Sequence, residues 1–309
     1  MKFIKDGLFG LAIGEAFGVQ LDMESSDFSN PVTTMQDSRA YDCPIGSFSD
    51  DTSMLLASMD SFIKSKEINS KDILDALCDW INKNAYSSTD YLFDISKTVR
   101  ISLMDYWKNK NSETCGILEE DKQDASCLSR VFLLNMVYSS SNISDEKLID
   151  ELKKVIRITH NNEISFLGCF IAYKYMKYII DGNNPKYALT LLKRYNYKKY
   201  FTDYSIEKYK RILFDDIKTI KLESIDNSSN IVSILESVLF IISNTDNYKD
   251  AIITYNMLGN ANGVRSSITG LFAGLIYSEK SIPKEWNIVL KRKDYLNKMS
   301  RKIKQVLSM

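Results

Sequence analysis

Hydrophobic residues along this chain recur mostly three or four positions apart, which is the spacing of one face of a helix. Alternating runs typical of strands are scarce, and 4 prolines with 12 glycines are too few for the many tight turns of an all-β chain. The pattern therefore predicts an all-α fold with polar loops at 110–127 and 219–230. The expected helices cover residues 4–19, 53–64, 70–83, 91–109, 128–139, 145–158, 163–180, 185–195, 205–219, 231–243, 248–258, 266–278 and 291–307.

The first expected helix has a glycine at every fourth position, at Gly10, Gly14 and Gly18. A spacing of four puts these residues on one helix face. Because each glycine lowers helix propensity by up to about 1 kcal/mol, their register indicates a tertiary contact that compensates. The spacing predicts that another backbone approaches this face closely. Gly270 and Gly274 repeat the same spacing in the helix expected at 266–278.

Charge and composition exclude several classes of protein. Lys plus Arg and Asp plus Glu each number 40, so no global basic field favours binding to nucleic acid or to a membrane surface. No apolar run reaches the ~20 residues that span a bilayer, and Glu15 interrupts the apolar N-terminal stretch that superficially resembles a signal peptide. Five cysteines without a CxxC spacing and a single histidine argue against a zinc site, and they favour a reduced, cytoplasmic setting.

The first candidate site is the polar cluster Ser49-Asp50-Asp51-Thr52, which stands just before a helical pattern. Such residues cap helix N-termini, and carboxylates are favoured at the positive end of a helix. Two adjacent carboxylates between hydroxyls exceed what a cap requires, and hard cations such as Mg²⁺ prefer oxygen ligands of this kind. Taken alone, the cluster favours capping over metal binding.

The second candidate site is Gly259-Asn260-Ala261-Asn262-Gly263, which also precedes a helical pattern. Asn and Gly are typical of turns and caps, and amide oxygens can bind a cation without offsetting its charge. The two clusters lie near opposite ends of the chain. If they meet in space, residues 1–309 must fold as a single domain.

Isolated charged residues are the remaining candidates. Glu15 lies in an otherwise apolar helix, where a buried carboxylate must be paired, protonated or functional. The lone His160 is by itself more typical of a structural or exposed residue, with hydrogen bonding to a ligand as the functional alternative. Arg130 and Arg265 can pair with carboxylates or with a diphosphate.

The order of these segments resembles the ADP-ribosylglycohydrolase family, of the dinitrogenase-reductase-activating and ADP-ribosylarginine hydrolase type. The family patterns are G-x-x-x-G-D-A-x-G-x-x-x-E, G-x-x-T-D-D-T-x-M, T-H-x-x-x-x-A-x-x-G and a final G-G-D-x-D-T segment that ends in I-P-x-x-W. The matching segments here are GLAIGEAFGVQLDM, GSFSDDTSM, RITHNNEISFLGCFIAY and LGNANGVRSSITGLFAGLIYSEKSIPKEW. Four such segments in the family's order make the resemblance specific.

The resemblance implies a compact orthogonal helical bundle with a central cleft that binds two Mg²⁺ or Mn²⁺ ions. In that family the ions hold the ribose hydroxyls of ADP-ribose and a water molecule that attacks its anomeric carbon. Position by position, Ser49, Asp50 and Asp51 match the first set of metal ligands, and Asn262 stands where a later aspartate ligand is found. The implied cofactor is Mg²⁺, with Mn²⁺ as an alternative.

The resemblance also implies roles in catalysis and substrate binding. Asp22 matches the family's glutamate and Glu15 its aspartate, and together with Asp51 they are the predicted catalytic carboxylates. The loop that the family writes G-N-G-x-L-M-R keeps only Leu128 and Arg130 here. The predicted substrate-binding residues are His160, Arg130, Asn260 and Gly259.

The sequence departs from the family at Asn260, Asn262 and Gly263, which replace two carboxylates and a hydroxyl. Two neighbouring cations need several carboxylates to offset their repulsion, so one bound ion is expected rather than two. The implied function is hydrolysis of ADP-ribose from a modified protein side chain or a related acceptor. The alternatives are an impaired pseudoenzyme that binds ADP-ribose, a modified protein or another partner without turnover, and an altered enzyme that acts on another nucleotide-like ligand.

Overall fold

The computed structural model describes residues 1–22, 31–38, 40–120, 124–221, 224–226, 228–256, 258 and 262–309. Within these residues the structure is all-α and contains no β-sheet, which confirms the predicted fold class. The same part of the chain has no helix that is both long and apolar enough to cross a membrane. The helices are α1 (Phe3–Val19), α2 (Asp50–Ser65), α3 (Ser70–Lys83), α4 (Lys97–Asn109), α5 (Leu128–Tyr138), α6 (Asp145–Ile156), α7 (Glu163–Ile180), α8 (Pro185–Arg194), α9 (Asp203–Lys208), α10 (Lys210–Leu213), α11 (Ile231–Ser243), α12 (Tyr248–Asn256), α13 (Asn262–Tyr277), α14 (Lys284–Val289) and α15 (Lys293–Leu307), with short 3-10 helices at Tyr197–Lys199, Ile217–Thr219 and Glu279–Ser281.

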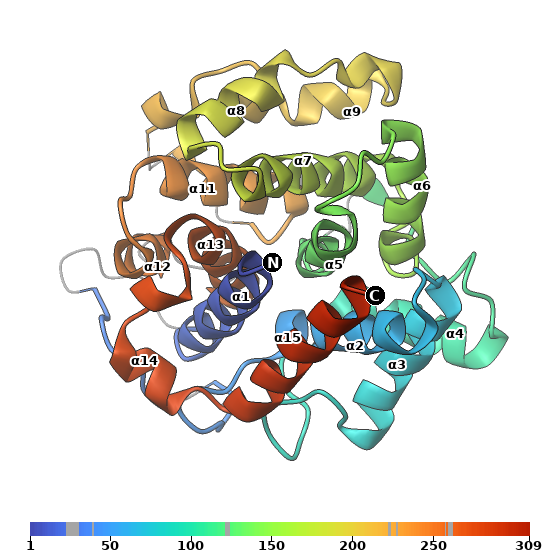
Figure 1. Ribbon diagram of the computed structural model, residues 1–309, viewed down its shortest axis with the longest axis vertical. Helices are drawn as coiled ribbons and strands as arrows, with labels where there is room; N and C mark the ends of the chain where they lie inside the picture. Colours follow the sequence, from blue (N-terminus) through green and yellow to red (C-terminus); the bar gives the residue numbers. More distant parts are fainter. Residues whose placement is uncertain are drawn as a thin grey trace.

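Helices α1 and α13, from opposite ends of the chain, lie side by side near the centre of the molecule (Figure 1). Their backbones touch at glycines: a Cβ atom built on Gly10 would stand 2.2 Å from the carbonyl oxygen of Gly270. One built on Gly14 would stand 2.3 Å from the carbonyl oxygen of Ser266, and one on Gly274 would stand 2.3 Å from that of Asp6. The close backbone approach predicted from the glycine spacing is therefore found at these positions.

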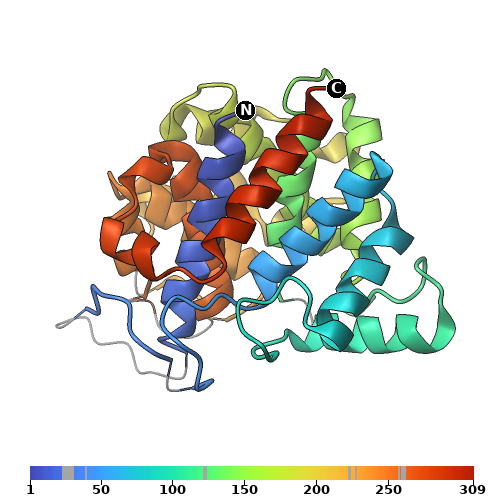
Figure 2. The same ribbon diagram turned by 60° about the horizontal axis from the view of Figure 1, so that its bottom comes forward.

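The other helices surround this central pair. Helix α7 packs against α5 and α8 on one side of the molecule, while α2, α3 and α15 cover the other side (Figure 1). The segment that joins α1 to α2 and the loop before α4 lie at the same end of the bundle (Figure 2). Two contacts join them there: the ring centroids of Tyr41 and Phe93 are 5.4 Å apart, and the Tyr91 hydroxyl donates to the Asp42 carbonyl.

Three predicted helices have different bounds for local reasons. Helix α4 begins at Lys97 instead of residue 91, because Asp94 has a left-handed φ of 47° and the Ser96 side chain accepts the Val99 N–H as a cap. The helix expected at 205–219 is divided into α9, α10 and a 3-10 turn. The helix expected at 266–278 begins at residue 262, and the short helix α14 was not predicted.

The contact between α1 and α13 leaves no room for a methyl group. We expect Gly10→Ala to lower the free energy of unfolding by about 3 kcal/mol, the upper part of the usual range for overpacking, because the contact is with backbone and forces the helices apart. Gly182→Ala is the control. A Cβ atom added there meets open space, but the φ of +90° is unfavourable for alanine, so the free energy of unfolding should fall by about 1–2 kcal/mol from backbone strain alone. Urea unfolding of the two variants measures both, and equal losses would contradict the packing argument.

Candidate active site

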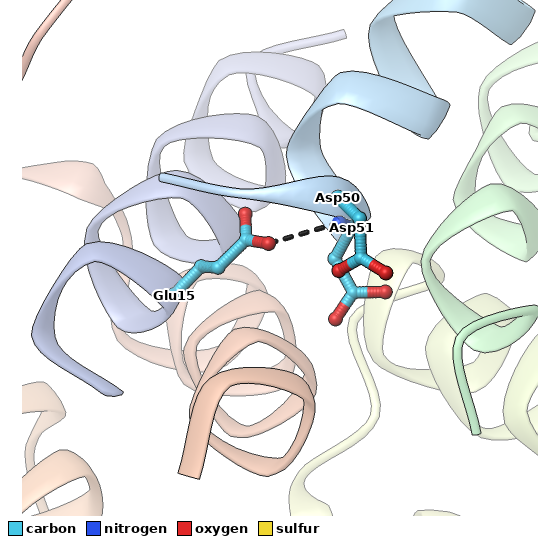
Figure 3. A group of neighbouring side chains, drawn as sticks. All are labelled: Glu15, Asp50 and Asp51. Carbon is cyan, nitrogen blue, oxygen red and sulfur yellow. Dashed lines mark hydrogen bonds between the residues drawn. The ribbon is translucent and has the colours of Figure 1, made fainter. Parts of the chain in front are cut away.

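The first turn of α2 is capped by a side chain from another helix. Glu15, on α1, accepts the backbone N–H groups of Asp51 and Thr52 at 2.9 and 3.0 Å, and also the Ser49 hydroxyl at 2.9 Å. Figure 3 shows its carboxylate directed at the start of α2, beside Asp50 and Asp51. Two of the otherwise unpaired N–H groups of this helix end are thus satisfied within the protein, and α1 fixes the position of the two aspartates.

A cleft of about 560 Å³ opens beside this helix end. Its wall combines the end of α1, the segment before α2, the loops before α4, α5 and α11, and the start of α13. It is lined by Asp22, Tyr41, Asp50, Asp94, Ser96, Lys97, Asp124, Ser126, Ser229, Gly263 and Val264. Residues from both ends of the sequence therefore meet in one cleft, and the volume is in the range of small-ligand sites.

Burial and mutual repulsion perturb the acids at the base of this cleft. Carboxylate oxygens of Glu15, Asp50 and Asp51 lie within 4.8 Å of one another, and all three side chains are buried. Burial raises the pKa of Glu15 to about 7, although its hydrogen bonds oppose the shift. Burial, followed by the charges of neighbouring carboxylates, raises the pKa values of Asp50 and Asp51 well above their usual range. The cluster needs bound protons or a cation to be stable.

The donor set fits a single hard divalent cation. Asp51 Oδ2 accepts the Ser267 hydroxyl, but the buried Oδ1 has no hydrogen-bond partner among the described residues. A neighbouring donor is the hydroxyl of Ser129, which interacts with Asp51 closely enough to lower its pKa, but neither Ser129 nor Oδ1 makes a hydrogen bond of normal geometry in the described structure. Asp50 faces the cleft, and its Oδ2 accepts the Ser96 N–H at 3.0 Å. A buried carboxylate oxygen that lacks a donor is the arrangement that a Mg²⁺ or Mn²⁺ ion would complete.

The opposite wall is organised around Asp124. Its carboxylate accepts the Ser96 hydroxyl at 2.7 Å and the Ser126 N–H at 3.0 Å, and its Oδ1 lies 3.3 Å from Nε2 of His160. Burial opposes ionisation of Asp124, but His160 and the serine hydrogen bonds outweigh it and hold its pKa well below the usual range. Burial likewise opposes protonation of His160, yet Cys127 and Asp124 raise its pKa. The pair is consequently an ionised carboxylate beside a readily protonated imidazole.

Arg130 lies behind this wall and is fully buried. Its guanidinium donates to the Val155 carbonyl at 3.0 Å and to the Thr159 hydroxyl, which in turn lies 2.8 Å from Nδ1 of His160. A buried chain therefore leads from Arg130 through Thr159 and His160 to Asp124. Neither Arg130 nor His160 is among the residues that line the cleft, so this geometry favours a positioning role over the predicted direct contact with substrate.

Arg265 is the second fully buried arginine near the cleft. Its guanidinium donates to the carbonyl of Ser228 at 3.0 Å and to that of Asp226 at 3.4 Å, and it lies 5.5 Å from the ring centroid of Tyr255. These contacts hold the segment that carries Ser229, a residue of the cleft wall.

The other predicted site residues fall into three groups: those in the cleft wall, those buried behind it, and those outside the described residues. Asp22 and Asp50 line the cleft, whereas Glu15, Ser49 and Asp51 lie buried directly behind it. Asn262 begins α13, but its side chain lies outside the described residues. Gly259 and Asn260 also lie outside them, so their roles remain predictions.

The sequence patterns missed two aspartates in the cleft wall. Asp94 was hidden because residues 91–109 read as one helix, whereas the helix in this stretch begins only at Lys97. Asp124 was visible only as a departure from the family loop, and its partnership with His160 joins two distant loops. In the structure a β-bridge pairs residues 117 and 160, a contact that the sequence patterns did not indicate.

The whole chain matches a known family. A family model described as ADP-ribosylglycohydrolase matches residues 2–308, and the protein therefore belongs to the ADP-ribosylglycohydrolase family. Among curated relatives, the ADP-ribosylarginine hydrolase Tri1 of Serratia proteamaculans (strain 568) is 25% identical over 309 residues, which cover 97% of this chain and 78% of that protein. The protein of the same name from Pseudomonas putida (strain GB-1) is 22% identical over 303 residues, with 97% and 77% covered.

A solved structure supports the fold. The chain named as an ADP-ribosylglycohydrolase-related protein complex superimposes with a TM-score of 0.81 at 18% identity, and the alignment covers 100% of this chain and 99% of that one. The expected helical bundle of the family is thus confirmed by structural similarity as well as by the helices themselves.

Removing the cap on α2 should destabilise the protein. In Glu15→Ala the N–H groups of Asp51 and Thr52 stay buried without a partner, which costs about 1–3 kcal/mol for each, partly offset by reduced repulsion among the acids. Glu67→Ala, at an exposed position, should change the free energy of unfolding by less than about 0.5 kcal/mol. Denaturant titrations of both variants test this, and matching midpoints would show that the cap is dispensable.

Stability of the metal-free protein should fall with rising pH. The folded-state pKa values of Glu15, Asp50 and Asp51 are raised, so the folded protein holds more protons than the unfolded chain above about pH 4.5. This contribution is complete below that pH and is lost as pH rises through about 7 and beyond. Unfolding in a chelator at pH 5.5 and pH 8 measures the fall, which should be smaller in Asp51→Asn. A rise in stability over this interval would refute it.

Proposed function

We propose that this protein removes ADP-ribose from an ADP-ribosylated acceptor by cation-assisted hydrolysis at the anomeric carbon, with ADP-ribosyl-arginine as the first candidate substrate. The observation that carries the proposal is the buried oxygen of Asp51, which lacks a partner beside an acidic cleft. The family supports ADP-ribosyl chemistry, and the curated relatives are named as ADP-ribosylarginine hydrolases.

One divalent cation, Mg²⁺ or alternatively Mn²⁺, would be held by Asp50 and Asp51. When bound, such an ion supplies positive charge that orients substrate oxygens and lowers the pKa of water. A single ion is proposed because the second polar cluster has asparagines at Asn260 and Asn262, which offer no charge to offset a second cation.

Asp22 is the proposed acceptor of the proton from the attacking water. Its Oδ1 accepts the Gly263 N–H at 3.3 Å and its Oδ2 accepts the Tyr41 hydroxyl at 3.3 Å, so the carboxylate is held in the cleft wall by two donors. The two hydrogen bonds hold the carboxylate at the cleft, where a base would have to stand to reach the water.

The acidic walls suit the charge that develops during the reaction. Asp22, Asp50, Asp94 and Asp124 surround the cleft, and glycoside cleavage passes through a transition state with positive charge on the sugar ring. The same walls favour an acceptor that carries positive charge, as arginine does. The buried chain of contacts from Arg130 through Thr159 and His160 would hold Asp124 in its place in the cleft wall.

The protein is proposed to act in a reducing, cytoplasmic compartment. All five cysteines are free and buried, although Cys127 and Cys169 have sulfur atoms only 3.6 Å apart. Free thiols at this distance are consistent with a reducing environment.

The test is release of ADP-ribose from ADP-ribosyl-arginine by metal-stripped protein, with and without added Mg²⁺. We expect Mg²⁺-dependent turnover and a loss of at least about 100-fold in Asp51→Asn, since this substitution removes a charge that would hold the ion. Asp150→Asn, an exposed position on α6, is the matched control and should keep full activity.

Calorimetric titration with ADP-ribose separates the alternatives. Binding without turnover in the presence of Mg²⁺ would replace the hydrolase with the pseudoenzyme, an alternative that the two asparagines favour. Absence of both binding and turnover would overturn the assignment of ADP-ribose as the ligand.

A further inference from the structure

Asp94 holds an unusual backbone conformation in the cleft wall. Its φ of 47° is left-handed, a region that residues other than glycine enter at a cost, although Asp and Asn enter it more readily than most. The loop is fixed by the neighbouring Ser96, whose N–H donates to Asp50 and whose hydroxyl donates to Asp124. The Asp94 carboxylate is therefore presented to the cleft by a segment that is tied to two other acids.

The carboxylates of Asp22 and Asp94 both lie close to Gly263, in the space that a side chain at this position would occupy. A Cβ atom built on Gly263 would stand 3.2 Å from Oδ2 of Asp94 and 3.5 Å from Oδ2 of Asp22. The Tyr41 hydroxyl donates to Asp22 at 3.3 Å, and the Ser49 hydroxyl lies 3.3 Å from Oδ2 of Asp94. Burial raises the pKa of Asp94, although the Tyr41 and Ser49 hydroxyls oppose the shift. The two acids come from the end of α1 and the loop before α4, and the backbone between them is that of α13.

The charges around this space are poorly balanced. Four aspartates line the cleft, and Lys97 is the only basic residue among the described residues of its wall. Asp124 has His160 beside it, whereas Asp22 and Asp94 have neutral donors beside them, among them the hydroxyls of Tyr41 and Ser49. Independently of this count, the buried Oδ1 of Asp51 and the neighbouring Ser129 hydroxyl have no hydrogen-bond partner in the described structure. Together these observations indicate that a positively charged ligand completes the cleft.

We propose that Asp94 is a cation-binding residue of this cleft, which faces Asp22 across the space beside Gly263. The inference rests on the proposed function, because it assigns a further residue to the cation site of that function. It follows that the loop before α4 supplies negative charge that the second polar cluster, with its asparagines, does not. Glycine at 263 is then required because a side chain would press on the Asp94 carboxylate.

The first test measures Mn²⁺ binding to metal-stripped protein by calorimetry and by the paramagnetic resonance of free Mn²⁺. Asp94→Asn removes the charge, and Asn tolerates the left-handed backbone. We expect its dissociation constant for Mn²⁺ to rise at least about tenfold, the lower end of the effect of losing a metal-site partner. Asp90→Asn, in the same loop but exposed, should leave the constant unchanged.

The second test is Gly263→Ala, which adds a methyl group 3.2 Å from the Asp94 carboxylate and does not change its charge. We expect weaker Mn²⁺ binding with an unchanged or higher melting temperature, because alanine is the better helix former in the first turn of α13. A purely structural role for Asp94 would instead lower the melting temperature of Asp94→Asn without changing Mn²⁺ affinity.

The outcomes separate this inference from the proposed function. Wild-type binding of Mn²⁺ that Asp94→Asn leaves intact overturns the role of Asp94 alone. Failure of the wild-type protein to bind Mn²⁺ overturns the cation site and, with it, this inference. Binding that depends on Asp94 without release of ADP-ribose supports the inference and counts against hydrolysis.

Discussion

The backbone contact between α1 and α13 is the constraint on which the rest of the molecule depends. Gly10, Gly14, Gly270 and Gly274 let two helices from opposite ends of the chain lie closer than any side chain would permit. Because α1 carries Glu15 and ends beside Asp22, while α13 begins beside Gly263, this contact brings together both ends of the sequence at one cleft. The remaining helices close around that pair and place the loops that complete the wall.

Glu15 connects this packing to the chemistry of the site. Its carboxylate caps the N-terminus of α2 by accepting the N–H groups of Asp51 and Thr52. Asp50 and Asp51 are therefore held in place, and their own carboxylate oxygens are not needed for these two N–H groups. The cost is a cluster of buried acids that repel one another, and burial rather than any single neighbour is the main cause of their raised pKa values. Such a cluster is unfavourable for folding alone, and strongly perturbed buried acids of this kind are typical of functional sites.

Much of the fold could be predicted from the sequence, because the helices are long and strongly periodic and because glycines at a spacing of four have few other uses. The candidate site was predictable only in part. Asp50 and Asp51 stand in a recognisable motif, and resemblance to the family supplied Asp22. The capping role of Glu15 and the burial of Arg130 could not be predicted, since each depends on a partner from another helix. Asp94 was not predicted as a site residue, because residues 91–96 have the periodicity of a helix and nothing in the sequence shows that Asp94 has a left-handed backbone.

The cap on α2 also determines how the protein can treat negative charge. A free helix N-terminus attracts phosphate, but the first-turn N–H groups of α2 already face a carboxylate. The start of this helix is therefore closed to an anionic ligand, and under the proposed function the diphosphate of ADP-ribose must lie away from it. Under that function selectivity would have a direction: the sugar end of the ligand would face the acids, and its phosphates would extend towards Lys97, the exposed basic residue in the described wall of the cleft.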